Sequence, residues 1–242
     1  MDSGTAQRLI EINRDFYTRF GDSFSATRRR IQPGVQRVLG ALRSDESILD
    51  LGCGNGEMAR WLAKNGHRGP YLGVDFSPPL VRDARGQPEG FSRSFLQADI
   101  TRLSMVRDQL SVESGWSLVT AFAVLHHIPS TGLRLDLLRT VHRLLRSDGL
   151  FIHSNWQFMN SEKFRVRVQP WEAAGLAEIE VESGDYLLDW RNGGRGLRYV
   201  HHFEERELYE LASASRFEVV DGFHSDGEGG NLSLYQVWKP VP

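Results

Sequence analysis

The stretch Ser47-Ile48-Leu49-Asp50-Leu51-Gly52-Cys53-Gly54-Asn55-Gly56 joins a short apolar run to an acid and three alternating glycines, and a helical pattern follows from Met58. This order predicts a strand, a tight loop and a helix, which is the first unit of a nucleotide-binding βαβ fold. Glycines lack a Cβ atom, so they adopt positive φ and let a ligand lie against the backbone, while the helix start offers free N–H groups. We therefore expect a ligand site at this loop.

The length and composition of the chain indicate a globular protein with one good core. Of its 242 residues, 25% are charged and 40% belong to the hydrophobic set. This length suits a single α/β domain over residues 1–242. The net charge of −2 predicts no general affinity for nucleic acid, although a sum does not reveal a local basic face. The N-terminus lacks an apolar signal core and no run approaches bilayer length, so we expect a cytoplasmic protein without membrane contact.

Cys53 is the only cysteine, which excludes an intramolecular disulfide and is compatible with a reducing compartment. Its place inside the glycine loop would suit a nucleophile. No base is evident beside it, and we favour the interpretation of a small residue where space is short.

Strand and helix patterns alternate from Ile48 to His153. Five strands are expected, near residues 48–50, 71–75, 94–97, 117–124 and 150–153, with helices between them. This alternation predicts a Rossmann-like, mostly parallel sheet with helices on both faces. Residues 217–223 and 232–238 flank a short glycine-rich loop after a helix over 204–214, so they should add an antiparallel C-terminal hairpin and bring the sheet to seven strands.

Two segments lie outside this alternation. Residues 1–45 predict an N-terminal helical cap: an amphipathic helix over 5–20, broken by Gly21 and the polar run to Thr27, and a second helix after Pro33. Residues 157–200 are too long for a plain connection and predict a lid or substrate-recognition insert. We expect the tryptophans Trp171 and Trp190 to form the core of that insert.

Three of the expected strands end in an acid, at Asp50, Asp75 and Asp99, and parallel sheets bind ligands at this end. A carboxylate at Asp75 can accept both ribose hydroxyls, which fits a dinucleotide or an adenosyl ligand. A dinucleotide fingerprint would need a third glycine at position 57, where Glu57 stands. Asp50 suits a ligand with an ammonium and a sulfonium group better than a pyrophosphate.

Asp50–Gly56, Asp75 and Asp99-Ile100 together resemble the three binding motifs of class I S-adenosylmethionine-dependent methyltransferases. The resemblance covers residues 47–155 and implies S-adenosylmethionine as the cofactor. It implies that Gly52 and Gly54 accommodate the methionine part, that Asp75 binds the ribose and that Asp99 binds the adenine amine. The remaining residues of the expected cofactor site are Asp50, Cys53, Asn55, Phe76, Ile100, Ala123 and His126.

A narrower resemblance covers nearly the whole chain. Phe24-Ser25-x-Thr27-Arg28, Ala123–His127, Pro170-Trp171 and Arg198-Tyr199-x-His201-x-Phe203 follow the order found in tRNA wobble-uridine methyltransferases, which esterify the carboxylate of 5-carboxymethyluridine. Val200 stands where eukaryotic members have a second tyrosine, and a tryptophan-rich ending is absent. The resemblance implies tRNA as the substrate and a small zinc-binding activator subunit as a partner.

The same resemblance implies five catalytic residues: Arg28, His127, Arg198, Tyr199 and His201. A carboxylate acceptor is ionised at neutral pH and needs no strong base, so arginines and histidines would hold the anion in line. Arg28 would bind a carboxylate or a phosphate, or is a surface cation. We expect His126 to line the cofactor and His127 to lie nearer the acceptor, and the three residues 198, 199 and 201 to close over it or to form a polar lid edge.

Several alternatives remain at this level. Trp156 either stacks on a base or belongs to the core, and the histidine pairs lack a spacing that demands a metal, so we predict none. A methyltransferase for a small-molecule carboxylate or amine suits the mildly acidic charge, and a non-catalytic adenosyl-binding scaffold is a third reading. A basic stripe joining residues 28–30 with Arg165, Arg167, Arg195 and Arg198 would favour tRNA.

Overall fold

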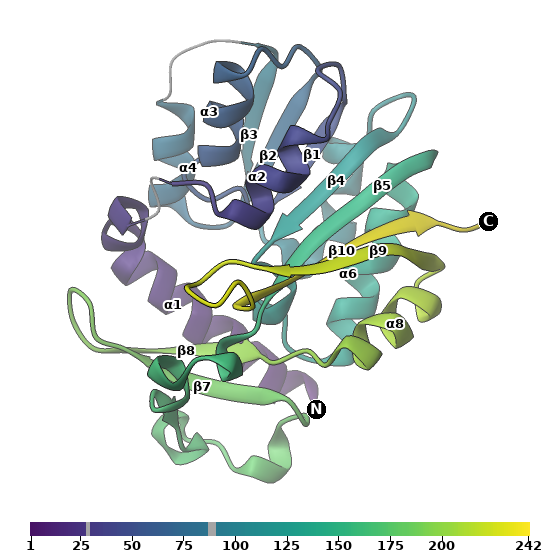
Figure 1. The fold of residues 1–242 in the computed structure, drawn as a ribbon. Coiled ribbons are helices and arrows are strands. Elements are labelled where there is room, and N and C mark those ends of the chain that lie inside the picture. The colour runs from purple at the N-terminus through teal and green to yellow at the C-terminus, as the bar shows by residue number, and fades with distance from the viewer. Residues whose placement is uncertain (28–29, 87–90) are drawn as a thin grey trace.

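The computed structural model describes residues 1–27, 30–86 and 91–242, with the backbone alone at 22–27. Within the described residues, seven strands form the central sheet in the order β3-β2-β1-β4-β5-β10-β9 (Figure 1). Its strands are β1 (Ile48–Leu51), β2 (Tyr71–Asp75), β3 (Arg93–Gln97), β4 (Trp116–Phe122), β5 (Leu145–Trp156), β9 (Phe217–Ser225) and β10 (Ser233–Pro240). β1 to β5 pair in parallel, and β10 runs antiparallel to both β5 and β9. The predicted mixed sheet and its C-terminal hairpin are therefore confirmed.

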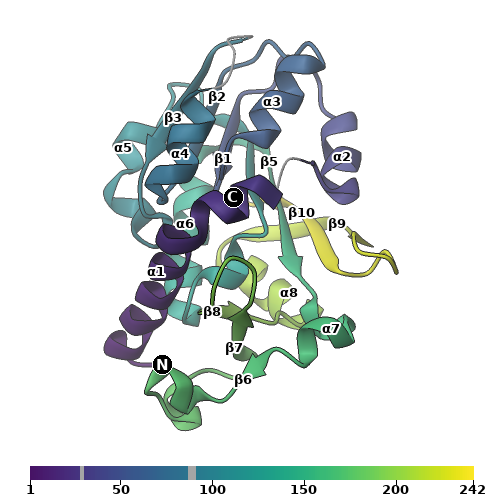
Figure 2. The same ribbon diagram turned by 90° about the vertical axis from the view of Figure 1, so that its left-hand side faces the viewer.

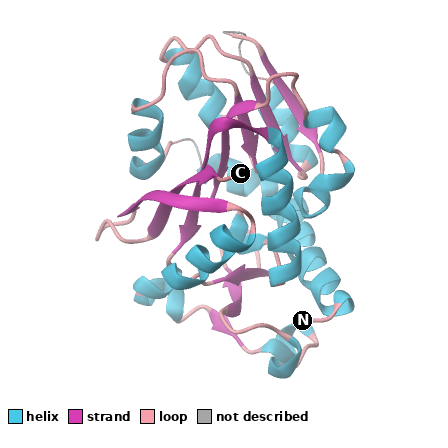
Figure 3. Ribbon diagram, turned by 90° about the vertical axis from the view of Figure 1, so that its right-hand side faces the viewer, coloured by secondary structure: helices cyan, strands magenta, loops and turns pink. Residues whose placement is uncertain are grey.

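Helices cover both faces of this sheet (Figure 3). They are α2 (Pro33–Gly40), α3 (Glu57–Lys64), α4 (Pro78–Arg85), α5 (Arg107–Leu110), α6 (Thr131–Leu144) and α8 (Glu205–Ala214), with 3₁₀ turns at Ile100–Met105 (η1) and Leu125–His127 (η2). Successive strand residues point to opposite faces. Leu49 therefore packs with the α6 side chains, whereas Ile48 packs with those of α2 and α3. β5 begins at Leu145, five residues before the predicted start.

The helix α1 (Ser3–Thr27) is continuous, and the predicted break at Gly21 is wrong. A glycine inside a helix costs only about 1 kcal/mol, which burial of neighbouring side chains readily offsets. Phe16, Tyr17 and Phe20 form one buried cluster with Phe76 and Trp190. α1 thus lies across the carboxyl ends of the strands and beside the insert (Figures 1 and 2).

The insert after β5 forms a small antiparallel sheet in the order β6-β7-β8, in a segment that the structure describes throughout. It contains η3 (Phe158–Asn160), α7 (Glu162–Arg165), β6 (Val168–Gln169), η4 (Trp171–Ala174), η5 (Glu178–Glu180), β7 (Asp185–Trp190) and β8 (Gly196–His201). Leu9 and Ile12 of α1 pack against Leu187 and Tyr199.

Among the described residues, no helix has the length and apolar character needed to cross a bilayer.

Candidate functional site

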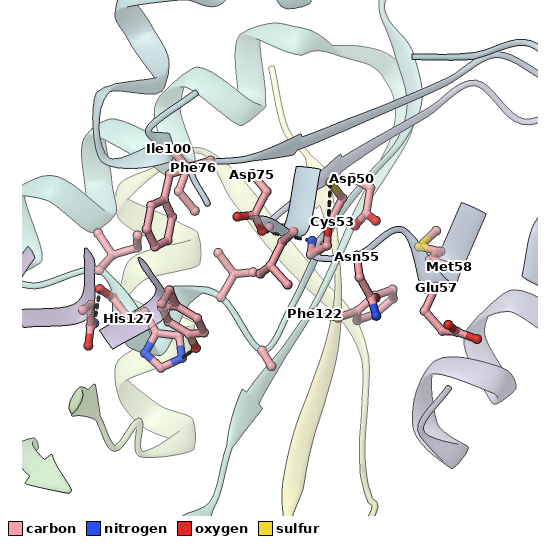
Figure 4. A pocket seen from close by; sticks show the side chains of 18 of the residues that line it. Asp50, Cys53, Asn55, Glu57, Met58, Asp75, Phe76, Ile100, Phe122 and His127 are labelled. Carbon is pink, nitrogen blue, oxygen red and sulfur yellow. Dashed lines mark hydrogen bonds between the residues drawn. The ribbon is translucent and has the colours of Figure 1, made fainter. Parts of the chain in front are cut away.

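A cavity of about 250 Å³ lies at the carboxyl ends of β1 to β4, with α1 on its opposite side (Figure 4). The loop after β1, the ends of β2 and β3 and the turn after β4 form one wall. α1 contributes Ile10, Asn13, Arg14 and Tyr17, and the segment before α2 contributes residues 30–32. Figure 4 shows Asp75 between Asp50 on one side and Phe76 and Ile100 on the other.

Two glycines of the loop after β1 serve different purposes. Gly52 has a φ of 72°, and a Cβ there would lie 2.3 Å from Val124 Cγ2, so no side chain fits. Gly54 has a φ of 55°, and a Cβ there would meet nothing within 4 Å among the described residues. The loop is therefore open at Gly54, where the backbone can approach a ligand.

Asp75 links the ends of the first two strands. Its two carboxylate oxygens accept the backbone N–H groups of Gly54 and Ser77, each at 2.9 Å. Each oxygen has a second lone pair for a further donor, such as a ribose hydroxyl. Burial raises the pKa of Asp75 above its usual range. The apolar side chains of Phe76 and Ile100 lie beside it and suit a flat adenine ring (Figure 4).

Asp50 is a buried acid that faces the same cavity. Tyr71 donates its hydroxyl hydrogen to Oδ2 at 2.7 Å, and Thr120 donates to Oδ1 at 2.7 Å. Burial raises the pKa of Asp50 to about 6, although both hydroxyls act in the opposite direction. A buried carboxylate favours a cation beside it, which fits the ammonium group expected here.

Asp99 connects the end of β3 to α1. Thr101 donates to its Oδ1 from both N–H and hydroxyl, at 2.9 and 2.7 Å, and Arg14 donates to Oδ2 at 2.8 Å. The ion pair with Arg14 was not predicted from the sequence. It places a cation of α1 at the expected adenine position.

The loop residues Cys53 and Ala123 both line the cavity. Burial raises the pKa of Cys53 well above its ordinary value, so the side chain is a neutral thiol, as the small-residue interpretation requires. Ala123 has a φ of 57°, a strained conformation for a residue with a Cβ. Its N–H donates to the hydroxyl of Ser154 at 3.0 Å, which holds the turn after β4.

Only one member of the histidine pair is found among the described residues that line the cavity, and it is His127. The expectation that His126 lines the cofactor is wrong: its ring is 2% exposed, and its Nδ1 accepts the N–H of Trp156 at 3.3 Å. The two residues belong to the 3₁₀ turn η2, in which consecutive side chains point about 120° apart. Only one of them can therefore face the cavity.

Tyr199 and His201 do not lie over the acceptor side of the cavity, so their predicted position is wrong. Both are fully or almost fully buried against Asp185, whose Oδ1 is 2.7 Å from the Tyr199 hydroxyl and 2.7 Å from His201 Nδ1. Arg134 donates to the Tyr199 hydroxyl at 3.2 Å, and Glu207 lies 2.9 Å from His201 Nε2. Alternate residues of β8 share a face, so both side chains point into this polar cluster.

Arg198 points to the other face of β8. Its guanidinium lies 4.8 Å from the ring centre of Trp156 and 5.4 Å from that of Phe16, and the residue is 8% exposed. It is not among the described residues lining the cavity, but its neighbour Phe16 contacts Tyr17, which does line the cavity. Arg28 falls outside the described residues. No group of three or more His, Cys, Asp or Glu side chains in the described part of the chain is placed to hold a metal ion.

The sequence reasoning missed the contribution of α1. Asn13 is 6% exposed; its amide donates to the carbonyl of His127 at 3.4 Å and accepts the N–H of Tyr199 at 2.9 Å. A signal was present, because this polar residue falls on the apolar stripe of the helix, four residues after Leu9 and three before Phe16. A polar residue at such a position is expected to have a buried partner.

Comparison with known proteins identifies the class. A family profile described as "Methyltransferase domain" matches residues 24–221, and the chain belongs to that family. A protein of Encephalitozoon cuniculi named as a methyltransferase is 29% identical over 90% of this chain and 91% of its own length.

Two further relatives carry more specific names. The tRNA (carboxymethyluridine(34)-5-O)-methyltransferase of Arabidopsis thaliana is 28% identical over 60% of this chain, which spans only 34% of that protein. The malonyl-[acyl-carrier protein] O-methyltransferase of Pseudescherichia vulneris is 25% identical over 66% of this chain and 68% of its own.

Comparison with solved structures also indicates a methyltransferase fold. The crystal structure of an S-adenosylmethionine-dependent methyltransferase from Methanosarcina mazei matches with a TM-score of 0.65 over 87% of this chain and 98% of that chain, at 23% identity. The predicted class I fold and the predicted methyltransferase are confirmed, with S-adenosylmethionine as the cofactor. The cavity fits that cofactor: the backbone is open at Gly54, Asp75 retains lone pairs, and Phe76 and Ile100 form an apolar wall.

Proposed function

We propose that this methyltransferase esterifies the carboxylate of a 5-carboxymethyl wobble uridine in tRNA. The observation that carries the proposal is a run of arginine and aromatic side chains beside the cofactor cavity. We call it the arginine–aromatic band; it consists of Lys163, Phe164, Arg167, Trp156, Arg198, Phe16, Trp190, Phe20 and Arg19.

Arg198 forms the centre of the band. It joins Trp156 at the end of β5 to Phe16 of α1. On one side, Trp156 contacts Phe164 with ring centres 4.7 Å apart, and Arg167 lies 5.7 Å from the Phe164 ring. The contacts therefore continue from the sheet to α7.

The other half of the band follows α1. Phe16 contacts Phe20 with ring centres 5.4 Å apart and Trp190 at 5.3 Å, and Arg19 lies 5.2 Å from the ring of Phe20. The hairpin tip around Arg195 adjoins this end, since a Cβ on Gly196 would lie 2.6 Å from the Phe20 ring. Figure 2 shows α1, the β7–β8 hairpin and α7 from left to right across the lower half of the molecule.

Phe16, Phe20 and Arg198 are the buried base of the band. Its half-buried rings (Trp156, Phe164 and Trp190) and its exposed cations (Arg19 and Lys163) give it the composition expected for binding single-stranded nucleic acid. Aromatic rings stack on bases and arginines neutralise phosphates. Lys163 of the band is exposed, as are Arg165 and Arg195 of the same insert, and the exposed Arg30 lines the cavity. A local basic face can bind RNA even though the net charge of the chain is −2. The name of the Arabidopsis relative supports the same acceptor.

The chemistry needs no general base. When bound, S-adenosylmethionine supplies an electrophilic methyl group. A carboxylate oxygen forms the new bond as the carbon–sulfur bond breaks and its electron pair moves to sulfur, so no proton is released. The protein therefore has to align the acceptor and exclude water. On the resemblance alone, we also propose a small zinc-binding subunit as a partner.

A second candidate is a methyltransferase for a small-molecule carboxylate or amine. The enclosing position of α1, the acidic net charge and the similarity to a malonyl-[acyl-carrier protein] O-methyltransferase favour it. It does not require the arginine–aromatic band, which would then be a packing feature.

Transfer of labelled methyl from S-adenosylmethionine to bulk tRNA tests the proposal. We expect label in tRNA that mild alkali releases, because a methyl ester is base-labile and an N-methyl group is not. Asp75→Asn, which we expect to weaken cofactor binding, serves as the matched inactive control. Label that resists alkali, or transfer only into a metabolite extract, would contradict the wobble-uridine proposal.

A further inference from the structure

We infer that Tyr17 of α1 holds the acceptor carboxylate by donating its hydroxyl hydrogen, and that His127 stands behind it as a second donor. This inference rests on the proposed function and deepens it. It adds a contact that neither the sequence motifs nor the relatives assign, on a helix that lies outside the cofactor motifs.

The main chain of β8 determines which nitrogen of His127 carries a proton. Nδ1 lies 3.1 Å from the carbonyl oxygen of Tyr199, which can only accept, so Nδ1 must donate. Nε2 lies 3.0 Å from the hydroxyl of Tyr17. Asn13 accepts the N–H of the same Tyr199 at 2.9 Å. The Tyr199 peptide is therefore held from both sides and keeps the imidazole in one orientation.

The pair has two hydrogen-bonding states. In neutral His127, Nε2 accepts from Tyr17, and the phenol presents a lone pair to the cavity. In protonated His127, Nε2 donates to the Tyr17 oxygen, and the phenol hydrogen is released to donate to a ligand. A carboxylate in the cavity favours the second state, since an anion stabilises the protonated imidazole. Among the described side chains, the His126 ring lies 4.3 Å from that of His127. The other titratable groups that line the cavity are Arg14, Arg30, Asp50, Cys53, Glu57, Asp75 and Asp99.

The position of Tyr17 suits the acceptor. It lies in the cavity wall formed by α1, and the cofactor motifs at the strand ends form the opposite wall. Its ring also contacts Phe16 of the arginine–aromatic band, with ring centres 5.0 Å apart, and Phe76 of the cofactor wall at 5.7 Å. Tyr17 therefore lies between the proposed RNA surface and the cofactor, where the reacting carboxylate has to be placed.

The test compares Tyr17→Phe with wild type in steady-state methylation of tRNA that carries 5-carboxymethyluridine, using the full chain. Phenylalanine keeps the ring contacts and removes only the hydroxyl. We expect kcat to fall roughly 10- to 100-fold, because a misplacement of about 1 Å can cost that much. The KM for tRNA should change less than about threefold, since the band supplies most of the binding, as should the Kd for S-adenosylmethionine. Tyr209→Phe, at an exposed position of α8, is the matched control and should leave kcat unchanged.

Two variants of His127 separate a donor from a base. His127→Gln keeps an amide that can donate to the Tyr17 oxygen, whereas His127→Leu keeps the volume without a donor. We expect His127→Gln to retain at least several-fold more activity than His127→Leu, with equal melting temperatures. If the two variants lose activity equally, the ability of residue 127 to donate a hydrogen bond does not matter. That result would overturn the inference.

The outcomes distinguish the two proposals. If wild type labels tRNA with a base-labile methyl group and Tyr17→Phe has the same kcat, the role of Tyr17 is refuted and the wobble-uridine function remains. If wild type binds S-adenosylmethionine but labels no tRNA even with the proposed zinc-binding subunit present, the proposed function fails, and the carboxylate contact fails with it.

Discussion

Asp50 behaves differently from an ordinary surface acid, because burial raises its pKa to about 6. For an acid with a raised folded-state pKa, the contribution to stability is present below the unfolded value of about 3.8 and is lost as the pH rises through about 6. A cationic ligand reverses this preference, because it favours the ionised carboxylate. Ionised Asp50 therefore destabilises the free enzyme, and we expect the bound cofactor to stabilise this ionised carboxylate.

The affinity for S-adenosylmethionine should therefore rise as the pH increases from 5 to 7. Asp50→Asn should remove most of this rise in titration calorimetry, while Asp136→Asn on the exposed side of α6 should preserve it. Burial also raises the pKa of Asp75, so a small residual slope is expected. An unchanged slope in Asp50→Asn would assign the titration to another group.

The strand β8 directs neighbouring side chains of one sequence motif to opposite faces. Arg198 and Val200 face the band side, whereas Tyr199 and His201 face the buried cluster around Asp185. Burial raises the pKa of Tyr199, so the phenol stays protonated and donates to Asp185. These side chains hold the strand in place, and the strand's main chain then orients His127.

Tyr199→Phe should accordingly lower stability and spare catalysis. It removes a buried hydrogen bond to a charged group, for which we expect a loss of about 1 to 3 kcal/mol in the free energy of unfolding. The kcat of the folded variant should stay within about threefold of wild type, because the backbone carbonyl is retained. Denaturant unfolding and single-turnover methylation measure the two effects. A large loss of kcat without loss of stability would restore the catalytic role suggested by the motif.

At the scale of the whole molecule, the proposed RNA surface joins the N-terminal helix α1 to a segment that lies more than a hundred residues later in the chain. α1, the end of β5 and the segment from α7 to the β7–β8 hairpin contribute its cations and aromatic rings. α8 lies apart from α1 in Figure 1. A summed net charge of −2 does not reveal such a surface, because acids elsewhere cancel it.

Replacing Lys163 and Arg195 together by alanine should weaken tRNA binding and lower its salt dependence. Each lost phosphate contact reduces the slope of log K against log salt by roughly 0.7 to 0.9. Fluorescence anisotropy with an anticodon stem-loop measures both quantities. Arg206→Ala on α8, whose side chain is 87% exposed, is the matched control. Identical slopes in both variants would argue against this surface.

Local sequence patterns determined the sheet, the glycine loop and the three strand-end acids, because strands and tight turns depend on neighbouring residues. Short apolar runs, a glycine at Gly52 and an acid at Asp75 are all visible over a few positions. Local patterns wrongly predicted the end of the first helix at Gly21. There, packing against residues distant in the chain outweighs the low helix propensity of glycine.

Only the tertiary structure decided which side chains share the cavity. The motifs placed Tyr199 and His201 at the acceptor and assigned no role to Tyr17, because a motif specifies order along the chain and not direction in space. The direction of each side chain follows from strand alternation, from the 3₁₀ turn at His127 and from the packing of α1 across the strand ends. The packing of α1 is the part that no local pattern encodes, because the contact between Tyr17 and His127 joins residues 110 positions apart.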